Sequence, residues 1–218
     1  MKIPAFALAL LFPAFALAQA ETPPAVDEPV QFRHVVPAQP VAVPPGRIEV
    51  LEFFWYGCPH CYAAEPHLAE WLENKPAEVS FRRIPVTLNR GWEVLARAYY
   101  TAEALDVLDR VHPALFAALH EQQRTLNTVD ELAAFFAEVA DVDEAAFRQA
   151  YASLEVASRV QQADVIARRY AVRSVPAMAV NGSYMTDPEL AGGYAAMVEV
   201  VQALVRKEHE ATPDSNGK

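Results

Sequence analysis

Apolar residues alternate between strand-like and helix-like patterns along the chain. From Arg47 the run RIEVLEFFWYG is β-branched and aromatic and ends at Gly57, which predicts a buried strand. The following PHCYAAEPHLAEWLENKP predicts a helix, and residues 79–86 predict a second strand. The long stretch 92–170 contains no Gly and one Pro and is rich in Ala, Leu, Glu and Arg, which predicts helices throughout, separated by caps.

Two helix starts inside this stretch have a capping signature. Thr128 with Glu131, and Asp141 with Glu144, each place a side-chain acceptor at a helix start and an acidic residue three positions later. Such pairs satisfy backbone amides that have no partner within the helix. We therefore predict helices that begin near positions 129 and 142.

Strand signals return after residue 170. Segments 177–180 and 183–186 flank Asn181-Gly182, a dipeptide typical of two-residue hairpin turns, and a closing helix is predicted at 188–207. A short edge strand is predicted at 31–36, inside a proline-rich leader. The order strand, helix, strand, block of helices, hairpin, helix predicts an α/β domain interrupted by a helical insertion.

The N-terminus carries a targeting signal. Residues 1–20, MKIPAFALALLFPAFALAQA, have one Lys, then an uncharged run, then small residues at Ala16, Ala18 and Ala20. This pattern predicts a secretory signal peptide cleaved after Ala18 or Ala20. An uncleaved membrane anchor is the alternative, although the run is shorter than the roughly 20 residues of a spanning helix and contains two prolines. Export would place the mature chain in an oxidising compartment.

Composition narrows the function classes. The chain has 218 residues, 53% of them apolar, and a formal net charge of −10. The apolar fraction excludes a disordered chain, and the acidic balance without a long basic stretch argues against nucleic-acid binding. A chain of this length buries enough apolar surface to fold without disulfides. The position of its two cysteines is therefore more informative than their number.

Both cysteines lie in Cys58-Pro59-His60-Cys61, where the first predicted strand passes into the helix. Proline favours the first helical position, which makes Cys58 the N-cap. The free amides and the positive end of the helix dipole favour a thiolate there. Cys61 follows one turn later on the same face, so the two sulfurs are able to bond.

Two other interpretations of this motif remain open. A structural disulfide would close a loop of two intervening residues and would add little stability. A zinc or copper site would use His60 or His67 as a further ligand, but the chain has no second pair of cysteines.

The run LEFFWYGCPHCYAAEPHL, the helical block and RSVPAMAVNG together resemble the DsbA-type periplasmic thiol:disulfide oxidoreductases, which have a thioredoxin fold with an inserted helical domain. The resemblance covers about residues 46–208. It implies a thioredoxin-like domain at 46–87 and 165–208 with a helical insertion at 88–164. The residues outside it are expected to form the signal peptide at 1–20, a Pro-rich leader at 21–45 and a flexible tail at 209–218.

The resemblance also implies an activity. Pro-His between the cysteines is the dipeptide of the oxidising members, so we expect an enzyme that donates a Cys58–Cys61 disulfide to folding, exported proteins through a mixed disulfide at Cys58. No cofactor besides that disulfide, and no metal, is implied. The implied partners are exported proteins with free cysteines and a DsbB-like, quinone-linked membrane oxidase, and we expect a periplasmic monomer that binds no nucleic acid. The alternatives are a disulfide isomerase or reductase of the same fold, and a metal carrier that uses Cys58, Cys61 and a histidine.

Further residues have expected roles around the cysteines. Val175-Pro176 precedes a predicted strand and matches the cis-proline beside the disulfide of the thioredoxin fold, where the Val175 backbone can pair with an extended substrate. An ordinary trans proline is the alternative. Pro59 and His60 are expected to tune the Cys58 thiolate, His60 as a hydrogen-bond donor, unless His60 is merely an exposed residue.

A charged pair is expected beneath the motif. Glu52 interrupts the apolar segment 48–54, where a carboxylate is costly unless it is paired or protonated. It matches the acidic residue that lies under the active site in the resembled family, and Arg83 matches its basic partner. The functional interpretation is proton exchange with Cys61, and the alternative is a structural ion pair.

Overall fold

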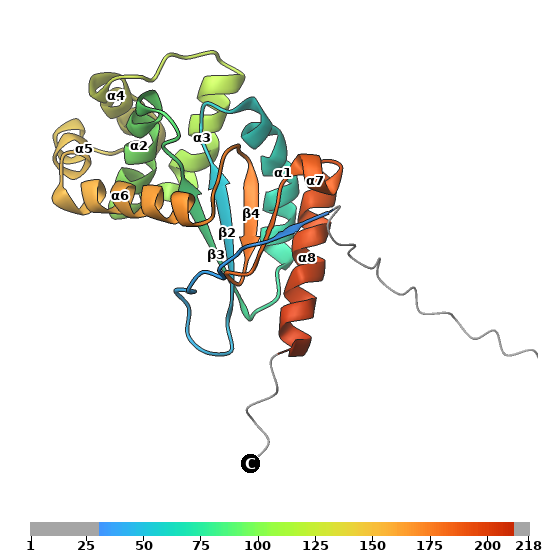
Figure 1. Ribbon diagram of the computed structural model, residues 1–218. Coiled ribbons are helices and arrows are strands. Elements are labelled where there is room, and N and C mark those ends of the chain that lie inside the picture. The colour runs from blue at the N-terminus through green and yellow to red at the C-terminus, as the bar shows by residue number, and fades with distance from the viewer. Residues whose placement is uncertain (1–30, 212–218) are drawn as a thin grey trace, which may run out of the picture.

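A five-stranded sheet in the order β1-β5-β4-β2-β3 forms the centre of the molecule (Figure 1). The computed structural model describes residues 31–211, so the predicted signal peptide and the first part of the leader lie outside the described residues. β2 and β3 pair in parallel, and the other neighbours pair antiparallel. The strands are β1 (Arg33–His34), β2 (Ile48–Phe54), β3 (Val79–Pro85), β4 (Ala177–Val180) and β5 (Tyr184–Thr186).

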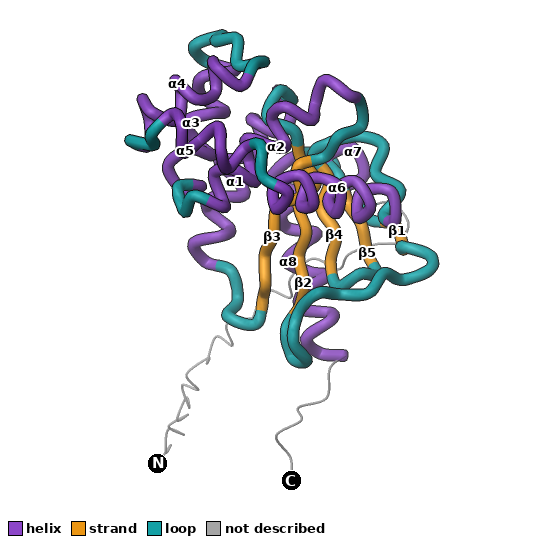
Figure 2. The backbone as a smooth tube through the Cα atoms, turned by 90° about the vertical axis from the view of Figure 1, so that its left-hand side faces the viewer, coloured by secondary structure: helices purple, strands orange, loops and turns teal. Residues whose placement is uncertain are grey.

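Helices cover both faces of this sheet (Figure 2). They are α1 (Pro59–Asn74), α2 (Glu93–Ala104), α3 (Leu108–His120), α4 (Val129–Ala140), α5 (Glu144–Tyr151), α6 (Leu154–Arg169), α7 (Pro188–Ala191) and α8 (Tyr194–Ala211), and a 3-10 turn, η1 (Arg90–Trp92), precedes α2. Ile48 and Val50 pack with α1 and α8 on one face, whereas Leu51 and Phe53 belong to the core shared with the helical block. β2 is therefore buried at every position. The predicted α/β fold with an inserted helical block is confirmed.

Structural features that depend on a few neighbouring residues were predicted correctly. Asn181 and Gly182 have φ of 47° and 70°, the left-handed pair that a type I′ hairpin turn requires. A Cβ at Gly182 would lie 2.0 Å from the Gln39 carbonyl oxygen, so this position needs glycine. Thr128 and Glu131 form both hydrogen bonds of a capping box at the start of α4.

The second predicted cap was wrong. Asp141 ends α4 in the left-handed conformation, with φ of 53°, instead of starting a helix. Asp143 is the N-cap of α5 and accepts a hydrogen bond from the Ala146 amide, so the helix begins at Glu144. The two aspartates lie two residues apart, and a side-chain acceptor at either position fits a helix start equally well in sequence.

Three other boundaries differ from the prediction. The closing helix divides into α7 and α8 at Gly192-Gly193, whose φ values of 92° and 144° are incompatible with a continuing helix. α8 then continues to Ala211, so residues 209–211 of the expected tail are helical. The edge strand shrinks to β1. Within residues 31–211 no helix is both long and apolar enough to cross a membrane.

Candidate active site

The two cysteines occupy the N-terminal turn of α1, at the carboxyl end of β2. Cys58 is the N-cap, with extended φ and ψ of −88° and 116°, and Pro59 is the first helical residue, as predicted. The Cys58 amide donates to the Trp55 carbonyl oxygen at 3.0 Å, which closes the turn between strand and helix. Both sulfurs are free thiols; Cys58 is 8% exposed and Cys61 is fully buried. Cys58 is therefore the sulfur that a reaction partner reaches.

The surroundings of the two thiols shift their pKa values in opposite directions. The pKa of Cys58 is lowered from 9.0 to about 6, first by a hydrogen bond from the Cys61 thiol, against an opposing effect of burial, and then by the amides of Cys61 and His60. The pKa of Cys61 is raised, first by burial and then because its proton is held in the hydrogen bond to Cys58. The helix amides favour the thiolate as predicted, but the Cys61 thiol contributes more than they do.

His60 points towards α8. Its Nδ1 lies 2.7 Å from the Tyr194 hydroxyl, so this nitrogen is engaged away from the cysteine sulfurs. The charge of His60 still lowers the pKa of Cys58, but it is the last of the causes, after the His60 amide. The backbone amide of His60 thus contributes more to the lowered pKa of Cys58 than its side chain does.

The loop before β4 lies against the reactive sulfur. The Val175–Pro176 peptide bond is cis, as the resemblance implies. The Cys58 thiol donates to the Val175 carbonyl oxygen at 3.5 Å. Residues 117 positions apart in the chain are thus brought together at the end of α1.

The predicted charged pair forms beneath the cysteines. Glu52 and Arg83 are direct neighbours in the parallel register of β2 and β3, and Arg83 Nε lies 2.9 Å from Glu52 Oε2. Glu52 is completely buried, and burial raises its pKa to about 8 although the Arg83 charge opposes this. The Glu52 carboxylate in turn adds to the rise in the pKa of Cys61.

Three polar residues of this region were missed in the sequence. Glu65 of α1 pairs with Arg83, with 3.1 Å from Oε2 to Nη2, and its Oε1 lies 3.3 Å from Nε2 of His112. His112 of α3 is buried, and its Nδ1 lies 2.8 Å from the Tyr56 hydroxyl. Helical spacing was an available signal for Glu65, because it follows Cys61 by four residues on the same face of α1.

A metal carrier, one of the alternatives, would need a cluster of side chains able to bind a metal ion. Across residues 31–211 no three His, Cys, Asp or Glu side chains cluster as metal ligands would. His67 lines a cavity between α1 and α8, together with Trp71 and Val198.

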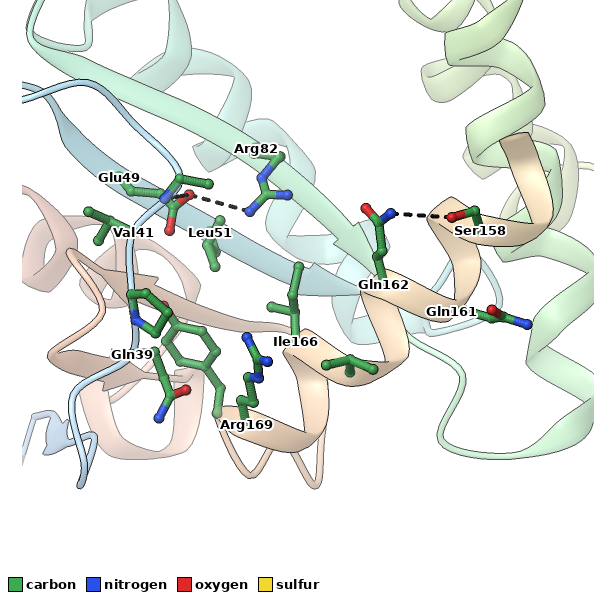
Figure 3. Close-up of a pocket in the computed structure, with 14 residues that line it drawn as sticks. Gln39, Val41, Glu49, Leu51, Arg82, Ser158, Gln161, Gln162, Ile166 and Arg169 are labelled. Carbon is green, nitrogen blue, oxygen red and sulfur yellow. Dashed lines mark hydrogen bonds and ion pairs between the residues drawn. The ribbon is translucent and has the colours of Figure 1, made fainter. Parts of the chain in front are cut away.

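A second cavity lies away from the cysteines (Figure 3). It has a volume of about 570 Å³ and lies between α6 and the strands β2 and β3. Arg82 and the buried Glu49 both line it and form an ion pair, with 3.3 Å from Nη2 to Oε1. None of the residues expected at the cysteine site lines this cavity.

Comparisons with known proteins agree with this architecture. A family model described as DSBA-like thioredoxin domain matches residues 84–196. The thiol:disulfide interchange protein DsbA of Azotobacter vinelandii is 39% identical over 199 residues, which is 90% of this chain and 92% of that protein. The crystal structure of Pseudomonas aeruginosa DsbA superimposes with a TM-score of 0.78 at 38% identity and covers 83% of this chain and 93% of its own. The crystal structure of oxidoreductase DsbA from Xylella fastidiosa superimposes with a TM-score of 0.79 at 31% identity and covers 87% of this chain and 100% of its own.

Proposed function

The chain belongs to the DsbA-like thioredoxin family of thiol:disulfide oxidoreductases, and from that membership we propose that it donates a Cys58–Cys61 disulfide to the cysteines of newly exported, folding proteins. The observation that carries the proposal is the asymmetry of the two thiols. Cys58 is the more accessible sulfur and has its pKa lowered to about 6, whereas burial raises the pKa of Cys61. A stabilised Cys58 thiolate favours the reduced protein, which makes its disulfide a stronger oxidant.

The proposed reaction has two exchange steps. A substrate thiolate attacks Sγ of Cys58; the new sulfur–sulfur bond forms, the Cys58–Cys61 bond breaks, and Cys61 leaves with the electron pair. A second substrate thiolate then attacks the substrate sulfur of the mixed disulfide, and Cys58 leaves as a thiolate. Its low pKa makes it a good leaving group. The substrate is oxidised by two electrons, which remain on the cysteine pair.

Proton transfer to Cys61 completes the first step. The raised pKa of Cys61 means that it takes up a proton once it leaves, and Glu52, with a pKa raised to about 8, is a nearby carboxyl group that is protonated at neutral pH. We assign Glu52 as this donor and Arg83 as the residue that positions it. Thiol release by Glu52→Gln across pH separates this role from a structural ion pair, since identical profiles support the ion pair alone.

Substrate contact is assigned to the loop before β4. The Val175 carbonyl oxygen lies 3.5 Å from Sγ of Cys58, so a peptide joined to Cys58 passes directly along the backbone of Val175 and Pro176. Backbone pairing of this kind gives affinity with little sequence preference, which suits an enzyme with many unfolded substrates.

The setting follows from the family. We propose that the enzyme works as a periplasmic monomer after removal of a signal peptide and that a DsbB-like, quinone-linked membrane oxidase removes the two electrons. We likewise propose residues 46–87 and 165–208 as the thioredoxin-like domain, and 88–164 as the insertion. Within this chain, the proposed cycle uses the Cys58–Cys61 disulfide as its redox group.

One measurement separates the oxidase from its alternatives. The Cys58–Cys61 pair is equilibrated with reduced and oxidised glutathione, and its potential is expected to approach the value of about −120 mV known for DsbA. A potential near the value of about −270 mV known for thioredoxin would refute the oxidase and support a reductase. A pair that binds Zn²⁺ or Cu⁺ tightly and then fails to cycle would support the metal carrier instead.

A further inference from the structure

A buried polar cluster joins the sheet and the cysteine-bearing helix α1 to the helical insertion. Its members are Glu52 of β2, Arg83 of β3, Glu65 of α1 and His112 of α3, with Tyr56 between β2 and α1. Successive contacts are 2.9 Å from Glu52 to Arg83, 3.1 Å from Arg83 to Glu65, 3.3 Å from Glu65 to His112 and 2.8 Å from His112 to the Tyr56 hydroxyl. Four secondary-structure elements therefore meet in one chain of polar contacts.

The contacts of His112 define the direction of its hydrogen bonds. Burial lowers the pKa of His112, so the ring is neutral at pH 7 and carries one N–H. Nε2 faces a carboxylate of Glu65, which can only accept, and Nδ1 faces the Tyr56 hydroxyl, which can donate. The proton therefore resides on Nε2, 3.3 Å from Oε1 of Glu65, where the N–H dipole acts on the carboxylate through space although the geometry is not that of a hydrogen bond.

The charges of the cluster do not cancel. Two carboxylates face one guanidinium, so the cluster carries one excess negative charge unless it binds a proton. Glu52 is fully buried, where an uncompensated charge is costly, and one bound proton makes the cluster neutral. Glu52 and Glu65 compete for that proton.

The two carboxyl groups are supported unequally. Glu65 accepts hydrogen bonds from Arg83 and has Nε2 of His112 3.3 Å from its Oε1, and although burial acts against it, these partners lower its pKa. Glu52 has Arg83 as its ion-pair partner, but neither of its carboxyl oxygens accepts a hydrogen bond from any residue in the range 31–211. Hydrogen bonds to the ionised form keep a carboxyl group ionised.

We propose that His112 is a positioning residue that holds Glu65 in its ionised form and thereby leaves the cluster's single exchangeable proton on Glu52. This inference rests on the proposed role of Glu52 as proton donor to Cys61. In the first exchange step Cys61 leaves as a thiolate, Glu52 gives it the proton, and the cluster regains its excess charge until solvent supplies another proton. The titratable and charged groups that face His112 are Tyr56, Glu65, Arg83, Tyr99 and, on its own helix, Asp109.

The unmodified protein supplies the first test. Carboxyl ¹³C shifts of the reduced protein are followed across pH, and Glu65 is expected to titrate well below Glu52. Imidazole ¹⁵N shifts are expected to show that neutral His112 carries its proton on Nε2. A proton on Nδ1, or a Glu65 that titrates above Glu52, overturns the proposal without any variant.

A matched pair of amides supplies the second test. The amide nitrogen of Gln at position 112 reaches the place of Nε2, whereas that of Asn reaches only the place of Nδ1, so His112→Gln keeps the donor to Glu65 and His112→Asn loses it. The apparent pKa of Glu52 is expected to fall by about one pH unit in His112→Asn, because Glu65 then shares the proton, and to return in His112→Gln. A His112→Asn protein whose Glu52 titrates as in the parent overturns the proposal.

The control lies on the same helix. His120 contacts the carbonyl oxygen of Tyr56 at 2.7 Å, so His120→Asn removes a contact to the same tyrosine without touching Glu65. It is expected to leave the titration of Glu52 unchanged, and an equal shift in His120→Asn and His112→Asn assigns the effect to packing and overturns the proposal.

The pH profile of the reaction completes the comparison. In the parent, the rate at which the oxidised protein reacts with a small dithiol is expected to change with pH as Glu52 titrates. In His112→Asn the midpoint of this pH profile is expected to shift to lower pH together with the pKa of Glu52. If Glu52→Gln leaves the parent profile unchanged, the role of Glu52 as proton donor fails, whereas the carboxyl titrations still decide the role of His112. The two failures are therefore distinguishable.

Discussion

The reduced protein should gain stability relative to its disulfide form as the pH rises. The pKa of Cys58 falls from 9.0 to about 6 in the folded protein, so the folded protein loses this proton at a lower pH than the unfolded chain does. For a group whose folded pKa is lowered, the stabilisation is complete above the unfolded pKa and is lost as the pH falls through the folded pKa. The window for this group is therefore pH 6 to 9. The disulfide form has no thiolate and lacks this contribution.

The size of the effect follows from the same shift. At about 1.36 kcal/mol per pH unit, proton linkage gives about 3 kcal/mol between pH 5 and pH 8.5. Part of the Cys58 side chain reaches solvent, and screening reduces the expected gain to about 1.5 kcal/mol. The same free energy corresponds to about 30 mV of redox potential, at roughly 1.4 kcal/mol per 30 mV.

Urea unfolding of both forms over pH 5 to 8.5 measures this difference, because groups common to the two forms largely cancel. The range ends at pH 8.5 because unfolded Cys61 ionises above it, whereas burial holds the pKa of folded Cys61 up. Reduced Cys58→Ser is the matched control and should lack the increment. A difference between reduced and oxidised protein that is constant across this range, or that falls as the pH rises, would refute the stabilised thiolate.

Three further predictions concern the surroundings of the cysteines. Glu52→Gln should raise the free energy of unfolding by about 2 kcal/mol at pH 7 and leave it nearly unchanged at pH 4, because the raised pKa of Glu52 destabilises the folded protein once the unfolded carboxyl ionises; urea titration at both pH values tests this. His60→Gly should raise the pKa of Cys58 only slightly, as read from thiolate absorbance, since the amide survives; an increase that returns the pKa to about 9 would show that the ring dominates. Gly57→Ala should lower the unfolding free energy by about 1–3 kcal/mol, because its Cβ would lie 2.3 Å from the Trp55 ring; a thermal melt like that of the parent contradicts this.

The features that sequence analysis predicted correctly are those whose cause lies within a few residues. Asn181-Gly182 forms its turn because both residues tolerate a positive φ, and Pro59 starts α1 because its ring sets the first helical φ. The pairing of Glu52 with Arg83 came from the family resemblance, and the parallel register of β2 and β3 supplies its physical reason.

The features that were missed depend on contacts between distant elements. His112 lies on a helix face with Val111, Leu115 and Phe116, so in sequence it looks like one polar residue in an apolar stripe. Its role depends on α3 packing against α1 and the turn after β2, which brings its ring next to Tyr56 and Glu65. A histidine on an apolar helix face is a usable signal only when an acidic residue is predicted to face it.

Position within one helical turn, more than residue type, makes the two cysteines chemically different. Cys58 precedes the helix, so the backbone amides of the first turn stabilise its thiolate, whereas Cys61 lies inside the turn and is fully buried. Because Cys61 is costly to ionise, its proton stays in place and is donated to Cys58, which makes Cys58 easier to ionise. The raised pKa of one thiol and the lowered pKa of the other are therefore one effect of a single shared proton. A helix that began one residue earlier would bring Cys58 into the turn and weaken both halves of that effect, which is why the N-cap position of Cys58 matters as much as the cysteine itself.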